Sequence, residues 1–565
     1  MTDHLDAADT RHTPDYFPEL ESDEGSPSVA KPSVVTVGAD CPLSLEDIET
    51  ISCGIQPVQI ADAASKKMAK SAEYLDSLVA QNLCIYGVTT GYGPLADNHI
   101  DPRCSDQLQR NLVYHLASGV GEPLLWQSAR AVVACRLQAL SQGLSAVSQT
   151  VPNMLAAVLN SGLAPVIPEK GTVGASGDLT PLSHMALALM GEGGWIDQYG
   201  EVDNATAFAR LGFAPLQLGP KEGLALVNGT SAMTGIAALN GALLRRLIKW
   251  SCLLSLANAE VFNGHRSAWH PLVGAARGQP GQQIIHDVLW SLLQADAKMQ
   301  PHDPTPKPIE GSGDVRHDQL LPQDPYSIRC VPQLLGACLD MLEHHDAIVS
   351  REISAVTDNP LLFADEETLI HAGNFFGQHV SFASDSLTNA AIMVAVMLER
   401  QIARITDVRQ NEGLPAFLQG NQTGLNSGFM GAQVTATALV AEMRTKAAPA
   451  SIQSIPTNGN NQDIVTMGTI AARRANEILA DVSRVAAIHS LCMAQAIDLR
   501  EQEGAQFSSA TLGVRAMVRE ISPFLDDDRP LSHDIENLSQ ILKNREKTSE
   551  ALENIQFVKD ALGRF

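Results

Sequence analysis

The chain has 565 residues and carries 39 Lys and Arg against 63 Asp and Glu, which gives a formal net charge of −24. This charge excludes a protein that binds nucleic acid through a broad basic surface, because no run of basic residues offsets the repulsion from phosphates. The hydrophobic share of 45% is enough for a large core. The low aromatic share of 5% favours closely packed helices over β-sandwiches.

Nine cysteines are scattered over the chain without a CxxC pair. An odd, scattered set is typical of reduced thiols rather than of a disulfide frame or a zinc site. The sequence also contains no HExxH, Walker A or Rossmann glycine pattern, so we expect no metal and no nucleotide. It begins without a basic and then apolar signal segment, and we expect a cytoplasmic protein that does not bind a membrane.

Residues 1–34 are rich in Asp and Glu and poor in large apolar groups, which predicts an acidic disordered tail. Order should begin at Val35, where Val-Thr-Val predicts a short strand. We expect residues 35–230 to form a smaller N-terminal catalytic region that carries polar, glycine-rich loops.

Residues 231–565 contain long helical patterns. Apolar residues recur every three or four positions over 236–262, 335–349 and 387–405, and two of these segments have a second apolar face. The pattern predicts a C-terminal bundle of long helices that continues into neighbouring subunits.

The motif that carries chemistry is Gly171-Thr-Val-Gly-Ala-Ser-Gly-Asp-Leu-Thr-Pro-Leu-Ser183. Taken alone, Ala175-Ser176-Gly177 is a glycine-rich turn before a helix, with Ser176 or Asp178 as the N-cap. With the Asp-Leu that follows and the later Pro-Leu, the segment resembles that of the histidine, phenylalanine and tyrosine ammonia-lyases. In that family these three residues cyclise into 4-methylidene-imidazol-5-one (MIO).

The residue types suit this cyclisation. The Gly177 nitrogen must attack the Ala175 carbonyl carbon, and glycine permits the tight bend that this needs. Loss of water closes a five-membered ring, and loss of the Ser176 hydroxyl leaves an exocyclic methylene. The product is an electron-poor alkene, which no ordinary side chain supplies. The resemblance therefore implies an autocatalytically formed cofactor with no metal and no nucleotide.

Six further segments match the family in order, and the resemblance covers roughly residues 40 to 545. These segments are residues 86–93 (YGVTTGYG), 222–230 (EGLALVNGT), 323–333 (QDPYSIRCVPQ), 356–360 (VTDNP), 371–378 (HAGNFFGQ) and 424–428 (GLNSG).

The resemblance implies a role for individual residues. Tyr86 is the base that removes the benzylic β-proton. Arg329 holds the substrate carboxylate with help from Asn228 and Tyr326, and Phe375 packs against the cofactor. Each residue also has a purely structural alternative: Tyr86 as a core residue, Arg329 as a surface residue, Asn228 as a helix cap and Phe375 as a packing residue.

Two places bear on the substrate. In the resemblance, His115-Leu116 occupies the position that contacts the substrate ring. Tyrosine-using members of the family have His-Leu at this position, phenylalanine-using members have Phe-Leu and histidine-using members have Ser-His. An imidazole can hydrogen-bond a phenol, although His115 is alternatively a satisfied helix histidine. The loop that carries Asn458, Asn461 and Gln462 is expected to bind substrate. Histidine-using relatives have a glutamate where this chain has Gln462, which counts against histidine.

The resemblance implies a mainly α fold with the aspartase/fumarase-like architecture. It also implies a homotetramer in which loops from three subunits complete each site. The expected reaction is elimination of ammonia from L-tyrosine to give trans-p-coumarate, with some activity on L-phenylalanine to give cinnamate. A tyrosine 2,3-aminomutase is the first alternative, and a catalytically silent helical scaffold is the second.

Overall fold

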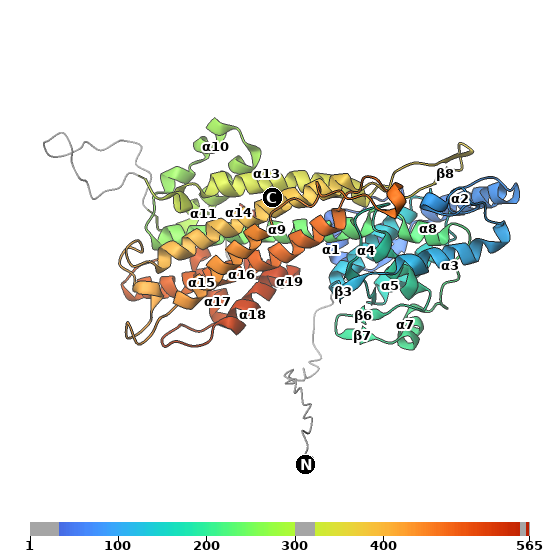
Figure 1. The fold of residues 1–565 in the computed structure, drawn as a ribbon. Helices are drawn as coiled ribbons and strands as arrows, with labels where there is room; N and C mark the ends of the chain where they lie inside the picture. The colour runs from blue at the N-terminus through green and yellow to red at the C-terminus, as the bar shows by residue number, and fades with distance from the viewer. Residues whose placement is uncertain (1–32, 300–322, 554–560, 564–565) are drawn as a thin grey trace, which may run out of the picture.

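The computed structural model describes residues 33–299, 323–553 and 561–563. Residues 1–32, almost all of the expected tail, lie outside this range. The described chain is mainly helical, as the sequence predicts, and it is elongated (Figure 1). The smaller N-terminal part lies at one end, and long helices run from it to the other end.

The N-terminal part combines short helices with small groups of strands. The predicted strand at Val35 is confirmed as β1 (Val35–Val37), which pairs in parallel with β2 (Val58–Ile60). The antiparallel groups are β3 (Val120–Pro123) with β5 (Pro168–Lys170), β4 (Ala164–Pro165) with β6 (Trp195–Asp197) and β7 (Gly200–Val202), and β8 (Leu361–Phe363) with β9 (Thr368–Ile370). The helices are α1 (Leu45–Ser52), α2 (Asp62–Ala80), α3 (Ser105–Leu116), α4 (Trp126–Leu140), α5 (Thr150–Asn160), α6 (Leu179–Leu189), α7 (Asn204–Leu211) and α8 (Glu222–Val227).

The three helical patterns of the C-terminal part are confirmed. They are α9 (Ser231–Val261), α13 (Val331–Ile353) and α14 (Gln378–Thr406), and they pack together with α16 (Gly468–Gln502). The remaining helices of this part are α10 (Pro271–Arg277), α11 (Pro280–Asp296), α12 (Tyr326–Arg329), α15 (Met430–Thr445), α17 (Ser509–Ile521), α18 (Ser532–Lys543) and α19 (Arg545–Glu553).

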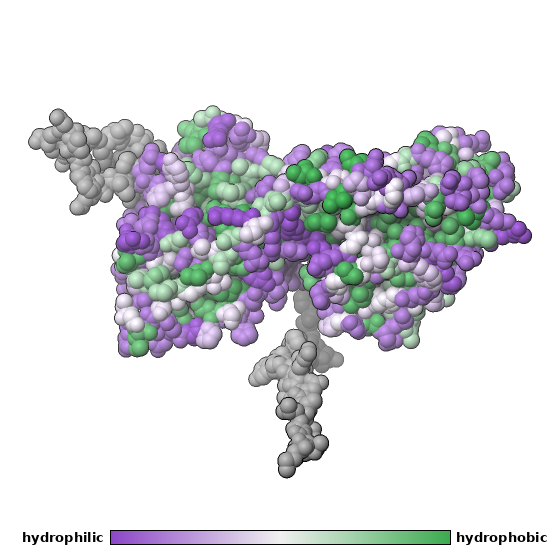
Figure 2. Space-filling view, viewed as in Figure 1, coloured by the Kyte–Doolittle hydropathy of each residue, from purple (hydrophilic) through white to green (hydrophobic). Residues whose placement is uncertain are grey.

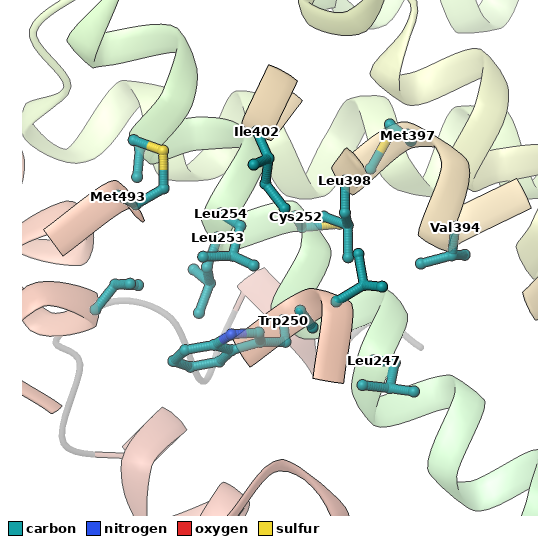
Figure 3. Close-up of a cluster of buried hydrophobic side chains, with 14 of the residues drawn as sticks. Leu247, Trp250, Cys252, Leu253, Leu254, Val394, Met397, Leu398, Ile402 and Met493 are labelled. Carbon is teal, nitrogen blue, oxygen red and sulfur yellow. The ribbon is translucent and has the colours of Figure 1, made fainter. Parts of the chain in front are cut away.

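Apolar side chains from several helices fill the centre of the bundle. Leu254 of α9, Leu398 of α14 and Met493 of α16 belong to one buried cluster (Figure 3). Trp250 is also fully buried, and its indole nitrogen donates to Ser490 Oγ at 3.0 Å, so its polar atom is satisfied. Helix α14 is long and apolar enough to cross a membrane, but 72% of its most apolar window is buried inside the molecule, as expected for a core helix.

The hydrophobic core consists of two main clusters that meet within α9. Residues up to Ala238 pack with the N-terminal part, and residues from Leu243 onward pack with the bundle. The first turns of α9 and α16 therefore lie inside the N-terminal part. The division of the chain at residues 230 and 231 stays a prediction, but this overlap of helix ends positions the candidate site.

Candidate functional site

The Ala175-Ser176-Gly177 segment forms a tight turn directly before α6. Ser176 has φ of 50° and Gly177 has φ of 76°, so two successive residues adopt the left-handed conformation. A Cβ on Gly177 would lie 2.0 Å from the Gly229 carbonyl oxygen. Glycine is therefore required at position 177 both for the bend and for the close approach of the two chain segments.

The carboxylate of Asp178 fixes this turn to two long helices. Asp178 Oδ2 accepts a hydrogen bond from the Met233 amide at 2.8 Å, and Oδ1 accepts one from the Thr469 hydroxyl. The Asp178 amide donates to the Gly229 carbonyl at 2.7 Å. The first turns of α6, α9 and α16 thus meet at the Ala-Ser-Gly turn, and their dipoles place positive potential around it.

Burial dominates the titration of Asp178. The side chain is fully buried, and desolvation raises its pKa to about 6 although the hydrogen bonds from Thr469 and Met233 oppose the shift. The carboxyl group is therefore ionised in neutral solution but becomes protonated in mild acid.

A cavity of about 460 Å³ lies beside the turn. Ten of the predicted site residues line it: Tyr86, His115, Leu116, Ala175, Ser176, Asn228, Phe375, Asn458, Asn461 and Gln462. Gly177 is buried next to them in the turn. The structure thus brings together residues from six segments that are distant in the sequence.

Tyr86 lies on the loop between α2 and α3. Its hydroxyl accepts a hydrogen bond from the Gly93 amide at 2.9 Å, and its ring meets the ring of Tyr92 edge to face, with centroids 6.3 Å apart. The Tyr86 amide donates to His371 Nε2 at 3.2 Å. Burial raises the pKa of Tyr92, so this neighbouring phenol stays neutral. Tyr86 is half-buried: it packs against the hydrophobic cluster of the N-terminal part and also lines the cavity.

His115 lies in the last turn of α3. Its Nδ1 is 3.1 Å from the Asn111 carbonyl oxygen. A carbonyl oxygen only accepts, so Nδ1 must carry the proton in this hydrogen bond. In the neutral imidazole, Nε2 is then left as a hydrogen-bond acceptor for a group in the cavity that His115 lines.

Asn228 directly follows α8 as its C-cap residue, and it is not the N-cap of α9. The N-cap of α9 is Thr230, which makes no side-chain cap hydrogen bond. The Asn228 side chain instead donates from Nδ2 to Asp358 Oδ1 at 3.2 Å and to the Asn359 carbonyl at 3.1 Å. Only 2% of Asn228 is exposed, so its orientation is fixed by these contacts.

The loop that carries Asn458, Asn461 and Gln462 closes another side of the cavity. Gln462 Oε1 accepts a hydrogen bond from Thr457 Oγ1 at 2.9 Å. Gly93 has φ of 53°, a conformation that favours glycine, and a Cβ there would lie 2.8 Å from Asn458 Nδ2, so this loop meets the loop of Tyr86 at a close contact. Asn458 and Asn461 are exposed, and the cavity is open at this side in the single chain.

Two predicted residues do not reach the cavity of their own chain. Tyr326 and Arg329 lie on α12, where Gln401 near the end of α14 donates to the Ser327 carbonyl at 2.9 Å. The Ala-Ser-Gly turn lies at the opposite end of α9, a helix of 31 residues and so about 46 Å long. Tyr326 is 72% exposed, and the Arg329 guanidinium lies 4.7 Å from the centre of its ring.

The sequence interpretation left out other residues of the cavity wall. Tyr92 and Asn359 line the cavity, and both lie in segments that the family resemblance had marked, 86–93 and 356–360. The motif was therefore a usable signal for them. Leu224 also lines the wall and lies in the marked segment 222–230, whereas Ile464 lies outside the marked segments and, as a single apolar residue, gives no signal of its own.

Comparison with known proteins shows the family. The sequence profile of the aromatic amino acid lyases matches residues 43–520. The chain belongs to the aromatic amino acid lyase family. A tyrosine ammonia-lyase of Cereibacter sphaeroides is 43% identical over 511 residues, which cover 90% of this chain and 97% of that protein. A histidine ammonia-lyase of Symbiobacterium thermophilum is 40% identical over 504 residues, which cover 89% of this chain and 96% of that protein.

One of the proteins similar to this chain is an aminomutase. An MIO-dependent tyrosine 2,3-aminomutase of Streptomyces globisporus is 38% identical over 512 residues, which cover 89% of this chain and 94% of that protein. The crystal structure of tyrosine aminomutase from the same organism superimposes with a TM-score of 0.86 at 35% identity, covering 93% of this chain and 99% of that one. The expected aspartase/fumarase-like helical fold is thereby confirmed, and the chain is an aromatic amino acid ammonia-lyase by family.

Asp178 gives this lyase a testable pH dependence of stability. Its pKa in the folded protein, about 6, lies above its ordinary value of 3.8. The contribution of Asp178 to stability is therefore fully present below pH 3.8 and is lost as the pH rises through 6. Between these values the free energy of unfolding should fall by about 3 kcal/mol relative to that of Asp178→Asn.

Denaturant unfolding at several pH values checks this difference. Asp203→Asn is the opposite-sign control, because hydrogen bonds from Thr206 lower the pKa of Asp203 at the N-cap of α7. A stability difference between wild type and Asp178→Asn that does not change with pH would show that Asp178 does not titrate as its burial requires.

Proposed function

We propose that the protein eliminates ammonia from L-tyrosine to form trans-p-coumarate, with lesser activity on L-phenylalanine to form cinnamate. The observation that carries the proposal is the single cavity lined by Tyr86, His115 and the Ala-Ser-Gly turn. Incubation with tyrosine, phenylalanine and histidine separately, followed by analysis of the products, tests it. Release of urocanate from histidine in place of p-coumarate from tyrosine would contradict it.

The turn at residues 175–177 fits the MIO group. The two left-handed residues and the glycine pressed against Gly229 give the sharp bend that ring closure needs. Ala175, Ser176 and Gly177 would form the ring, which supplies an electron-poor alkene as electrophile. The helix ends held by Asp178 would stabilise negative charge beside it.

The remaining residues handle the substrate. Tyr86 acts as the base in its phenolate form: the phenolate oxygen takes the benzylic β-proton and becomes a neutral hydroxyl. The Gly93 amide, which donates a hydrogen bond to this oxygen, stabilises the phenolate. His115 Nε2 accepts the phenol O–H of the substrate. Leu116 and Phe375 give apolar contact to the ring and the cofactor, and Asn458, Asn461 and Gln462 close the polar side of the cavity.

The carboxylate is held by Arg329 with Tyr326, and these residues come from a neighbouring subunit. Within one chain they lie at the far end of α9, and Tyr326 is largely exposed. A homotetramer in which loops of three subunits complete each site would bring them to the cavity. Exposed apolar residues support this assembly: Phe382 and Met393 on α14, and Val434 on α15. Figure 2 shows such residues between the polar ones on the bundle surface.

A tyrosine 2,3-aminomutase is the second candidate, favoured by the TM-score of 0.86 to the Streptomyces globisporus enzyme. It would use the same cavity but return ammonia to the β-carbon. β-Tyrosine as the main product would identify it. We place either enzyme in the cytoplasm, which agrees with nine free cysteines.

Removal of the Ser176 hydroxyl tests the cofactor. The intact mass of the wild-type protein should be two waters below that of the encoded chain, and Ser176→Ala cannot form the methylene. We expect this variant to fold, because only one hydroxyl is lost from a turn, but to lose nearly all turnover. Full activity of a wild-type protein with the unmodified mass would contradict MIO.

The His115→Phe variant tests the choice of substrate. A substrate phenol that is buried on binding and loses its hydrogen-bond partner costs about 1–3 kcal/mol, so kcat/KM for tyrosine should fall by about one to two powers of ten. Phenylalanine turnover should hold or rise, because the larger apolar contact suits an unsubstituted ring. Equal losses for both substrates would make His115 a structural residue.

Co-expression of two inactive variants tests whether sites are shared between subunits. Arg329→Ala and Ser176→Ala should each be inactive alone. If Arg329 serves the cavity of a neighbour, mixed tetramers regain about a quarter of their sites by random assembly. Tyr86→Phe with Ser176→Ala is the matched control, because Tyr86 and Ser176 line the same cavity of one chain, so mixing these two variants should restore no activity. Failure of the first pair to recover would place the carboxylate site elsewhere.

A further inference from the structure

A buried ion pair lies behind Asn228, and the reaction proposed above does not use it. Lys221 Nζ is 2.6 Å from Asp358 Oδ2, and at most 1% of either side chain is exposed. Lys221 also donates to the Ser145 carbonyl at 3.0 Å. Burial lowers the pKa of Lys221, and the charge of Asp358 opposes this shift. A buried ion pair adds little stability over apolar side chains of similar size, so its presence suggests a positional role.

The second oxygen of Asp358 faces the site. Asp358 Oδ1 accepts hydrogen bonds from Asn228 Nδ2 at 3.2 Å and from the Asn359 amide at 2.7 Å. The Asn359 carbonyl accepts from the same Asn228 Nδ2 at 3.1 Å. A carboxylate paired with an ammonium and a backbone carbonyl can only accept. These partners therefore require the NH2 end of the Asn228 amide and exclude its oxygen.

The side-chain oxygen of Asn228 remains available to accept a hydrogen bond from a group in the cavity that this residue lines. Among the described residues, no hydrogen bond reaches Asn228 Oδ1. The next residue, Gly229, is bonded to the cofactor-forming turn, because its amide donates to the Ser176 carbonyl at 3.3 Å. Asn228 and Ser176 thus lie in adjacent chain segments and line the same cavity, which must also hold the leaving nitrogen of the substrate.

We propose that Lys221 and Asp358 are positioning residues that hold Asn228 Oδ1 toward the cavity, where it accepts a hydrogen bond from the amino group of the substrate. A carboxylate cannot bind there, because neither oxygen carries a proton. Asn228 therefore orients the amine, and the carboxylate is left to Arg329. This inference rests on the proposed function and assigns to Asn228 a different substrate group from the one that the sequence suggested.

Two ligands that differ only in the amino group separate these roles. L-Tyrosine has the amine, whereas 3-(4-hydroxyphenyl)propanoate has the same phenol and carboxylate without it. We expect Asn228→Ala and Asp358→Asn in the full-length protein to raise KM for tyrosine by about ten- to a hundredfold. The inhibition constant of the propanoate should stay at the wild-type value.

Controls separate positioning from folding. Asp358→Asn leaves Lys221 buried without a partner, so the double variant Lys221→Met with Asp358→Asn removes both charges and should show the same ligand pattern. Asp346→Asn is the matched control, because Asp346 is also buried and lies 2.6 Å from Arg245 in an ion pair away from the cavity. It should leave both constants unchanged. The intact mass of each variant shows whether the ring has formed.

Two results would overturn the inference. Equal weakening of tyrosine and the propanoate would mean that Asn228 holds the carboxylate. Unchanged constants for both ligands in Asn228→Ala would mean that its amide does not touch the substrate. Either result leaves wild-type turnover of tyrosine intact, whereas failure of the proposed function would appear as absent turnover in the wild-type protein itself.

Discussion

The organisation of the site depends on one buried carboxylate. Asp178 follows the Ala-Ser-Gly turn directly, and it accepts hydrogen bonds from Met233 and Thr469 at the beginnings of two long helices. Burial makes the charge costly, as its raised pKa shows, but the donors and helix dipoles around it reduce that cost. The same contacts fix the turn to the ends of the bundle, so the site has a rigid base.

Close backbone packing complements this contact. The Gly177–Gly229 approach leaves no room for a side chain, and the adjacent Asn228 is held by a second buried polar group, Asp358. These interactions connect segments of the N-terminal part to one another or to the end of a long helix. The reactive turn and the amide beside it are therefore positioned by satisfied buried polar groups and not by surface loops, which is the arrangement that catalysis requires of its preorganised parts.

The long helices have the opposite effect on the rest of the site. They place α12 at the far end of α9, a helix that extends for 31 residues without a break and is about 46 Å long. A single chain therefore has an open cavity at one end, with an exposed Tyr326 and a half-buried Arg329 at the other. The length of the bundle makes an assembly of several chains the simplest way to complete the proposed site.

The sequence by itself determined what local patterns encode. Helical periodicity indicated the mainly α fold, and Ala175-Ser176-Gly177 with its flanking residues indicated the family and the tight turn, because bends and amphipathic faces arise from neighbouring residues. The tertiary structure alone decided which distant groups meet. It placed Asp178 against two helix ends, turned the amide of Asn228 and separated Arg329 from the cavity. These features depend on hydrogen bonds and packing between segments far apart in the chain, and the spacing of residues along the sequence does not specify them.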